Sequence, residues 1–191
     1  MFNSCKEILV FDFDGVIVES NQIKYDTFFN IWEGYSVQNK VRESLLIGGD
    51  RRQVISRVYN DLNMKLDLDY ALDFFVDMYS RLVHEEVMKI GVSQEVIRFL
   101  DQDKRIKFIN SATPQVELRA LCDDLGISEY FHGIFGAPRT KGDNFNIICK
   151  ENKVKVEQLV FFGDMQSDKS VAKEVNVEFC PIFSKGTDLD S

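Results

Sequence analysis

The chain has 191 residues, of which 45% are hydrophobic and 28% are charged. This composition is typical of an ordinary globular protein and excludes a disordered one. The formal net charge of −8 argues against a nucleic-acid partner and against a membrane surface, because both favour proteins with a basic face. No run approaches the ~20 apolar residues of a membrane span.

The cysteine pattern and the first residues of the chain bear on its compartment. The four cysteines are scattered along the chain, without the close spacing of a metal site or the density of a disulfide scaffold. The first residues contain no apolar leader segment. We therefore expect a cytoplasmic protein with reduced thiols. A monomer and a homodimer both fit the sequence.

The first half of the chain predicts one strand and then a helical insert. Residues 8–13 form a short apolar run that reads as a strand buried on both faces, as in a parallel sheet. Residues 21–86 contain no convincing strand, but several apolar stripes with helical spacing. We predict about four helices there, inserted into an α/β domain that consists of residues 1–20 and 87–191.

The second half alternates between strands and helices. Further apolar runs predict strands at residues 106–110, 133–136, 159–162 and 177–182. Helical patterns lie between them, at residues 116–125, 145–151 and 168–175. For the first of these helices, Thr113 is the expected N-cap, with Pro114 at the first helical position and Gly126 just after the end. The alternation predicts an α/β fold with a mainly parallel sheet flanked by helices.

Two carboxylates follow the first predicted strand. Asp12 and Asp14 are two residues apart, so in a strand they point to the same face. Carboxylates at the end of a buried strand are costly without compensation, and a divalent cation with its preference for oxygen ligands supplies it. Taken alone, the pair fits a solvated strand exit about as well as a functional site.

Asp164 and Asp168 follow a later strand in the same way. They are four residues apart and would share a face if the loop opens into a helix. Alone, such a pair is more often a turn with an N-cap than a metal site. Four carboxylates at strand ends would raise one another's pKa values sharply without a cation, so the combination favours a Mg²⁺ site.

Two further residues fit an anion beside these carboxylates. Ser111 follows a strand and precedes a helix, where its hydroxyl and the next backbone N–H groups favour an anion. Lys141 lies in a predicted loop before a helix. Singly, Ser111 fits a helix cap and Lys141 a solvated charge.

The order of these motifs resembles the haloacid dehalogenase-like superfamily of phosphotransferases. The sequence has Asp-x-Asp-Gly-Val after strand one, then a serine, a lysine and Gly-Asp-x-x-x-Asp, each after a later strand. Residues 12–20 look like the phosphoglycolate phosphatase and β-phosphoglucomutase branch, which carries its helical cap directly after the first motif. The resemblance covers residues 8–183 and implies a Rossmann-like core with a small all-helical cap at residues 21–86.

The resemblance implies a Mg²⁺-dependent phosphatase that acts on a small phosphorylated metabolite. Asp12 would be the nucleophile and Asp14 the general acid and base. Ser111 and the Ala112 backbone would bind the phosphoryl group, and Lys141 would neutralise its charge. The same resemblance assigns Mg²⁺ to four residues: Asp12, the Asp14 carbonyl, Asp164 and Asp168.

In proteins of this branch the cap chooses the substrate. Gly49, Arg51 and Arg52 lie in a segment that resembles the specificity loop, where an arginine would meet a second anionic group of the substrate. A solvated loop is an equal alternative for these residues. Lys24 falls near the place where mutase relatives carry a histidine, which favours a hydrolase over a mutase.

Three functions remain in view. A phosphatase is the leading one, and a phosphomutase acting on a sugar phosphate at the same site is the alternative. The third is a catalytically idle protein that binds a phosphorylated ligand, against which the complete set of motif residues argues. A receiver-type signalling domain also combines acidic residues, lysine and Mg²⁺, but its phosphoacceptor follows a later strand.

Overall fold

The computed structural model describes residues 2, 4–62 and 67–183. The chain divides into two compact units, one of Met1–Asn21 with Ile90–Ser191 and one of Gln22–Lys89. The first unit is an α/β domain and the second is helical. The boundaries at residues 20/21 and 86/87 stay a prediction.

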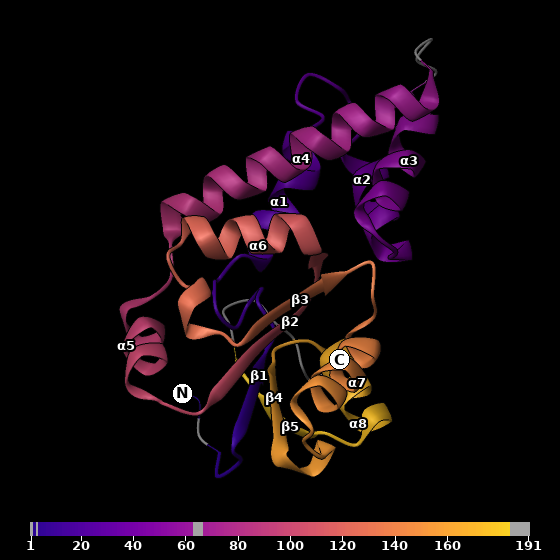
Figure 1. Ribbon diagram of the computed structural model, residues 1–191. Helices are drawn as coiled ribbons and strands as arrows, with labels where there is room; N and C mark the ends of the chain where they lie inside the picture. The colour runs from indigo at the N-terminus through magenta and orange to yellow at the C-terminus, as the bar shows by residue number, and fades with distance from the viewer. Residues whose placement is uncertain (1, 3, 63–66, 184–191) are drawn as a thin grey trace. The chain divides into compact units, whose positions relative to one another are not determined.

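A five-stranded sheet with the order β3-β2-β1-β4-β5 forms the centre of the first unit (Figure 1). All four strand pairs are parallel. The strands are β1 (Ile8–Phe11), β2 (Ile106–Pro114), β3 (Gly133–Ala137), β4 (Leu159–Gly163) and β5 (Glu178–Pro181). The predicted fold class, an α/β fold with a parallel sheet flanked by helices, is confirmed.

Helices cover both faces of this sheet, which explains why its strands read as continuous apolar runs (Figure 1). On one face, Ile8 and Val10 pack in a core with Phe145 and Ala172. On the other face, Phe11 stacks on Phe162 with ring centroids 5.0 Å apart. The helices of this unit are α5 (Gln94–Gln102), α6 (Gln115–Asp124), α7 (Lys141–Asn152) and α8 (Gln166–Val175), with short 3₁₀ turns at Ser128–Tyr130 and Val156–Gln158.

The start of α6 differs from its prediction. The helix begins at Gln115 with Pro114 as its N-cap, and Thr113 belongs to β2, so the predicted capping role of Thr113 is wrong. The physical reason is that the Thr113 hydroxyl donates to Asp14 Oδ2 at 2.9 Å and is not available to the helix. Gly126 follows the end of the helix with φ +68°, as predicted.

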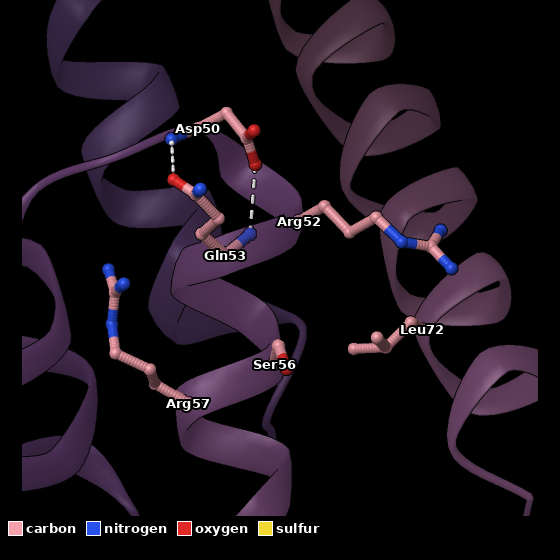
Figure 2. A pocket seen from close by; sticks show the side chains of 6 residues that line it. All are labelled: Asp50, Arg52, Gln53, Ser56, Arg57 and Leu72. Atoms are coloured by element: carbon pink, nitrogen blue, oxygen red, sulfur yellow. Dashed lines mark hydrogen bonds between the residues drawn. The ribbon is translucent and has the colours of Figure 1, made fainter.

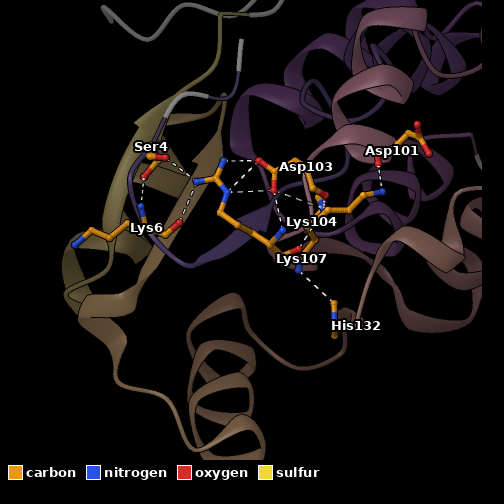
Figure 3. Close-up of polar contacts among 8 residues, drawn as sticks. Ser4, Lys6, Asp101, Asp103, Lys104, Lys107 and His132 are labelled. Atoms are coloured by element: carbon orange, nitrogen blue, oxygen red, sulfur yellow. Dashed lines mark hydrogen bonds and ion pairs between the residues drawn. The ribbon is translucent and has the colours of Figure 1, made fainter.

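Arg105 joins the segment before β1 to the sheet, at the edge where β1 and β2 begin. Figure 3 shows Ser4, Lys6 and Asp103 side by side there. Arg105 donates to the Ser4 carbonyl at 2.6 Å and to the Lys6 carbonyl at 3.0 Å, and pairs with Asp103. The buried Lys107 ammonium donates to the carbonyl groups of Asp103 and Arg105. The Arg105 contacts thus join the segment before β1 to the start of β2, at the edge of the sheet opposite to the polar motif residues.

The second unit consists of helices around an aromatic core. Within its described residues there is no strand, as predicted. Trp32, 2% exposed, packs on Phe75 with ring centroids 4.2 Å apart. The helices are α1 (Asn21–Asn30), α2 (Gln38–Ile47), α3 (Arg51–Asn60) and α4 (Leu68–Ile90). Over the described part of the chain, no helix is long and apolar enough to cross a membrane.

Candidate active site

The carboxyl ends of β1 and β4 bring two aspartates side by side. These strands pair with Phe11 opposite Phe162, and the Asp12 N–H donates to the Phe162 carbonyl at 2.9 Å. Asp12 therefore leaves β1 next to Asp164, which follows β4. Ligands of α/β sheets bind at such strand ends. Both residues are buried, with 5% and 0% exposure.

Asp168 joins them from the first turn of α8. One of its oxygens accepts a hydrogen bond from the Met165 N–H at 3.2 Å, which caps the helix and turns the carboxylate back toward β4. Asp164 lies before α8 and not on it, so the two aspartates do not meet through a shared helix face as predicted. Carboxylate oxygens of Asp12, Asp164 and Asp168 nevertheless lie within 4.8 Å of one another.

Lys141 supplies the positive charge at this cluster. Its ammonium lies 2.8 Å from Asp12 Oδ2 and 2.5 Å from Asp168 Oδ1. It is the first residue of α7 and not a loop residue as predicted. Its carbonyl accepts from Asn110 Nδ2 at 2.9 Å, and Asn144 donates in turn to the Asn110 amide oxygen at 3.0 Å. Two fully buried asparagines thus hold the start of α7 against β2.

Burial and charge set the protonation of these groups. Burial raises the pKa of Asp12 to about 7; Lys141 opposes this shift, while Asp168 and Asp14 add to it. Burial by itself lowers the pKa of Lys141, but the two carboxylates beside it reverse the shift, so its pKa lies above its usual value. Lys141 is therefore a permanent cation, whereas the charge of Asp12 depends on its surroundings.

The donor set fits a magnesium ion. Asp12, Asp164 and Asp168 offer three buried carboxylates with nearby oxygen atoms, and Mg²⁺ prefers hard oxygen ligands in a compact arrangement. One lysine cannot balance three negative charges in a region of low dielectric. A divalent cation would provide the remaining charge and would favour the ionised form of Asp12.

Asp14 has a different environment from these three. Its Oδ1 accepts from the Ser20 hydroxyl at 2.6 Å and its Oδ2 from the Thr113 hydroxyl at 2.9 Å. Its carboxylate is outside the cluster of potential metal ligands found in the described residues. The proposed metal contact of Asp14 concerns its backbone carbonyl and is compatible with this arrangement.

Ser111 and Ala112 lie within β2, near its end, and so the prediction that Ser111 follows the strand is wrong. Ser111 is 1% exposed, and its hydroxyl accepts from the Thr113 N–H at 3.2 Å. Ala112 is exposed between two buried neighbours. β2 pairs directly with β1, so Ser111 lies at the same edge of the sheet as Asp12.

Four polar residues of this site were missed by the sequence reasoning. Asn21 donates to Asp164 Oδ2 at 2.6 Å, and Ser20 and Thr113 donate to Asp14. Asn110 supports Lys141. Only Asn110, a polar residue at the end of an apolar strand run, carried a signal in the sequence; a serine, threonine or asparagine in a turn is too common to single out.

The residues predicted for substrate selection lie at the start of α3. Asp50 caps this helix through the Gln53 N–H at 2.9 Å, and Gly49 precedes it with φ +104°. Arg52 pairs with Asp73 of α4 at 2.5 Å and lines an open pocket of about 370 Å³ (Figure 2).

Arg51 has partners of its own on α4. It donates to the Ser80 hydroxyl at 2.5 Å, and its guanidinium carbon lies 5.1 Å from the centre of the Tyr79 ring. The two arginines therefore bind separate positions of α4.

Gly15 makes room for this site, and its replacement tests the metal centre. It has φ +74°, and an added Cβ would lie 2.0 Å from Asp164 Oδ2. We expect Gly15→Ala to displace Asp164 and to weaken Mg²⁺ binding at least about tenfold, as a lost ligand contact does, measured by titration calorimetry. Gly126→Ala is the matched control, because Gly126 has φ +68° and open space around it. Equal Mg²⁺ affinity in both variants would contradict the assignment.

Comparison with known proteins identifies the family of this chain. The sequence model of the family described as haloacid dehalogenase-like hydrolase matches residues 9–182. A phosphorylated carbohydrates phosphatase of Thermotoga maritima is 24% identical over 190 residues, which cover 90% of this chain and 82% of the relative.

Two solved structures share the fold. A predicted phosphoglycolate phosphatase of Haemophilus somnus has a TM-score of 0.73 and 18% identity, covering 93% of this chain and 85% of its own. CbbY of Rhodobacter sphaeroides, crystallised with xylulose 1,5-bisphosphate, has a TM-score of 0.70 and 16% identity, covering 97% and 91%.

Proposed function

We propose that this chain, which belongs to the haloacid dehalogenase-like hydrolase family, is a Mg²⁺-dependent phosphatase that hydrolyses a small phosphomonoester through an aspartyl-phosphate. The observation that carries the proposal is the buried Asp12, held 2.8 Å from Lys141 within the cluster that includes Asp164 and Asp168. A nucleophile held beside a cation and potential metal ligands suits attack on an anionic phosphoryl group.

In the first step an oxygen of Asp12 attacks phosphorus. The bond between phosphorus and the ester oxygen breaks, and Asp14 gives its proton to that oxygen, so that the alcohol leaves neutral. In the second step water attacks the aspartyl-phosphate and gives a proton to Asp14, and the bond between Asp12 and phosphorus breaks. The sum is hydrolysis of the ester to an alcohol and phosphate, with both aspartates restored.

The other site residues bind charge that develops during these steps. Lys141 neutralises the phosphoryl oxygens and Asp12. The Ser111 hydroxyl and the Ala112 N–H would hold a phosphoryl oxygen at the end of β2. Mg²⁺, held by Asp12, Asp164, Asp168 and the Asp14 carbonyl, would supply electrostatic stabilisation of the phosphoryl group.

We infer that the substrate is a small phosphorylated metabolite of the sugar phosphate class. Support comes from the name of the Thermotoga maritima relative, a phosphorylated carbohydrates phosphatase. The helical unit, proposed as the cap of residues 21–86, would select this substrate through Gly49, Arg51 and Arg52. The protein would act in the cytoplasm, as a monomer or homodimer.

Phosphate release from a panel of sugar phosphates, phosphoglycolate and nucleotides tests the function. We expect release that stops when EDTA removes the metal and that returns with added Mg²⁺, because one lysine cannot balance the carboxylate cluster together with a phosphate. The ranking of the panel identifies the substrate class. No release from any member in the presence of Mg²⁺, combined with isomerisation of a sugar phosphate, would replace the phosphatase by a mutase.

A further inference from the structure

We propose that Thr113 is a positioning residue that holds the Asp14 carboxyl group toward the ester oxygen of the substrate. The inference rests on the proposed function, in which Asp14 is the general acid and base. It assigns Thr113 a role that its sequence context, a residue before proline at the end of a strand, does not indicate.

The contacts of Asp14 carry this inference. The Thr113 hydroxyl donates to Oδ2 at 2.9 Å, and the Ser20 hydroxyl donates to Oδ1 at 2.6 Å. Thr113 is 4% exposed and Ser20 is fully buried, so these hydroxyl groups are protected from competition by water. A carboxyl group that is free to rotate adopts a broad range of orientations. Hydrogen bonds to both carboxylate oxygens hold Asp14 in a single orientation.

Thr113 is itself held firmly. The Gln115 side chain donates to the Ile134 carbonyl at 2.8 Å and accepts from the Gly136 N–H at 2.8 Å. This amide bridges the irregular end of the β2 and β3 pair, where the register shifts between Asn110 and Pro114. A Cβ on Gly136 would lie 2.4 Å from the Thr113 carbonyl oxygen, so only glycine permits this close approach. The end of β2 that carries Thr113 is therefore bound closely to β3.

The position of Thr113 also links the acid to the phosphoryl site. The Thr113 N–H donates to the Ser111 hydroxyl at 3.2 Å, and these residues, two apart, lie at the same strand end. An acid that gives its proton from one oxygen keeps the other as an acceptor, so one hydroxyl can stay bound during the transfer. Because Thr113 also contacts Ser111, its hydroxyl positions Asp14 relative to the bound phosphoryl group.

A comparison of kcat/KM for two esters of similar size distinguishes this positioning role from a general loss of structure. The phenolate that leaves phenyl phosphate is a poor leaving group, so cleavage of this ester depends strongly on a proton donated to the leaving oxygen. The leaving group of p-nitrophenyl phosphate is a stable anion, so cleavage of that ester depends much less on the proton. For both, kcat/KM reports the steps up to the release of the alcohol. A mispositioned acid therefore lowers kcat/KM for phenyl phosphate selectively.

The experiment compares Thr113→Val, which keeps the shape, with Thr113→Ser, which keeps the hydroxyl. For Thr113→Val we expect kcat/KM to fall at least about tenfold for phenyl phosphate and less than about threefold for p-nitrophenyl phosphate, within the range of general acid catalysis. Because Asp14 also serves as the base, kcat for p-nitrophenyl phosphate should fall and a burst of nitrophenol should appear. Thr113→Ser should restore both values, and Mg²⁺ affinity should stay unchanged in both variants.

The possible outcomes separate the two proposals. Equal losses for the two esters, or no loss, in a Thr113→Val protein that still binds Mg²⁺ would overturn the role of Thr113 and leave the phosphatase in place. A variant that loses Mg²⁺ binding and activity together, without rescue by serine, would show a structural role and would also overturn it. Hydrolysis of neither ester and of no sugar phosphate by the unaltered protein would contradict the proposed function, and the role of Thr113 with it.

Discussion

Asp12→Asn is expected to abolish phosphate release while the protein stays folded. The amide cannot attack phosphorus, so turnover should fall at least about 10³-fold, as it does when a nucleophile is removed. The fold should tolerate the change, because Asp12 is buried with its pKa raised to about 7 and a neutral group suits that position. The measurements are phosphate release, trapping of labelled phosphoenzyme and thermal unfolding.

Asp101→Asn is the control for this variant. Asp101 is exposed near the end of α5, and it contacts Lys104 through its backbone carbonyl. Its replacement should leave phosphate release and the melting temperature unchanged. Full turnover by Asp12→Asn would eliminate the aspartyl-phosphate mechanism, and a phosphoenzyme that still forms would place the nucleophile elsewhere.

Lys141→Met is expected to reduce activity and to make stability depend on Mg²⁺. The ammonium contacts Asp12 and Asp168 with its side chain only 12% exposed. Loss of one partner from a buried ion pair costs about 3–5 kcal/mol. Mg²⁺ should restore part of this loss, because it binds the folded carboxylate cluster and not the unfolded chain. Chemical unfolding with and without Mg²⁺, together with phosphate release, measures these effects.

The pH dependence of this variant follows from Asp12. Lys141 lowers the pKa of Asp12, so its removal raises a pKa that already stands at about 7 in the folded protein. A carboxyl group with a raised folded pKa binds more protons in the folded state, and stability falls as pH rises through the window between its unfolded and folded values. The variant should therefore lose more stability at pH about 8 than at pH about 5, without Mg²⁺.

Lys150→Met is the control, since it removes one charge from the exposed end of the same helix. It should change neither the Mg²⁺ dependence nor the pH dependence of unfolding. A Lys141→Met protein whose stability is the same at both pH values and with or without Mg²⁺ would show that Lys141 does not compensate the carboxylates.

The apolar pattern of the sequence was enough to predict the sheet and the aspartates that follow two of its strands. Buried parallel strands are continuous apolar runs. The polar residue that ends each run can be recognised in the sequence even when its partners in the fold are not known. For this reason Asp12 and Asp164 were found, and so were the five strands. A helical insert is predicted because helical apolar stripes replace those runs between residues 21 and 86.

Which side chains surround those aspartates depends on the folded arrangement of the chain. Thr113 binds a residue 99 positions away, and Asn21 binds one 143 positions away. Asp168 approaches Asp164 through the cap of its helix and not through helical spacing. Hydrogen bonds between distant segments leave no periodic trace in a sequence, because a single hydroxyl or amide satisfies them wherever the fold happens to bring it. The sequence therefore indicates the strands and the aspartates that follow them, and the packing of the folded chain decides how each carboxylate is held.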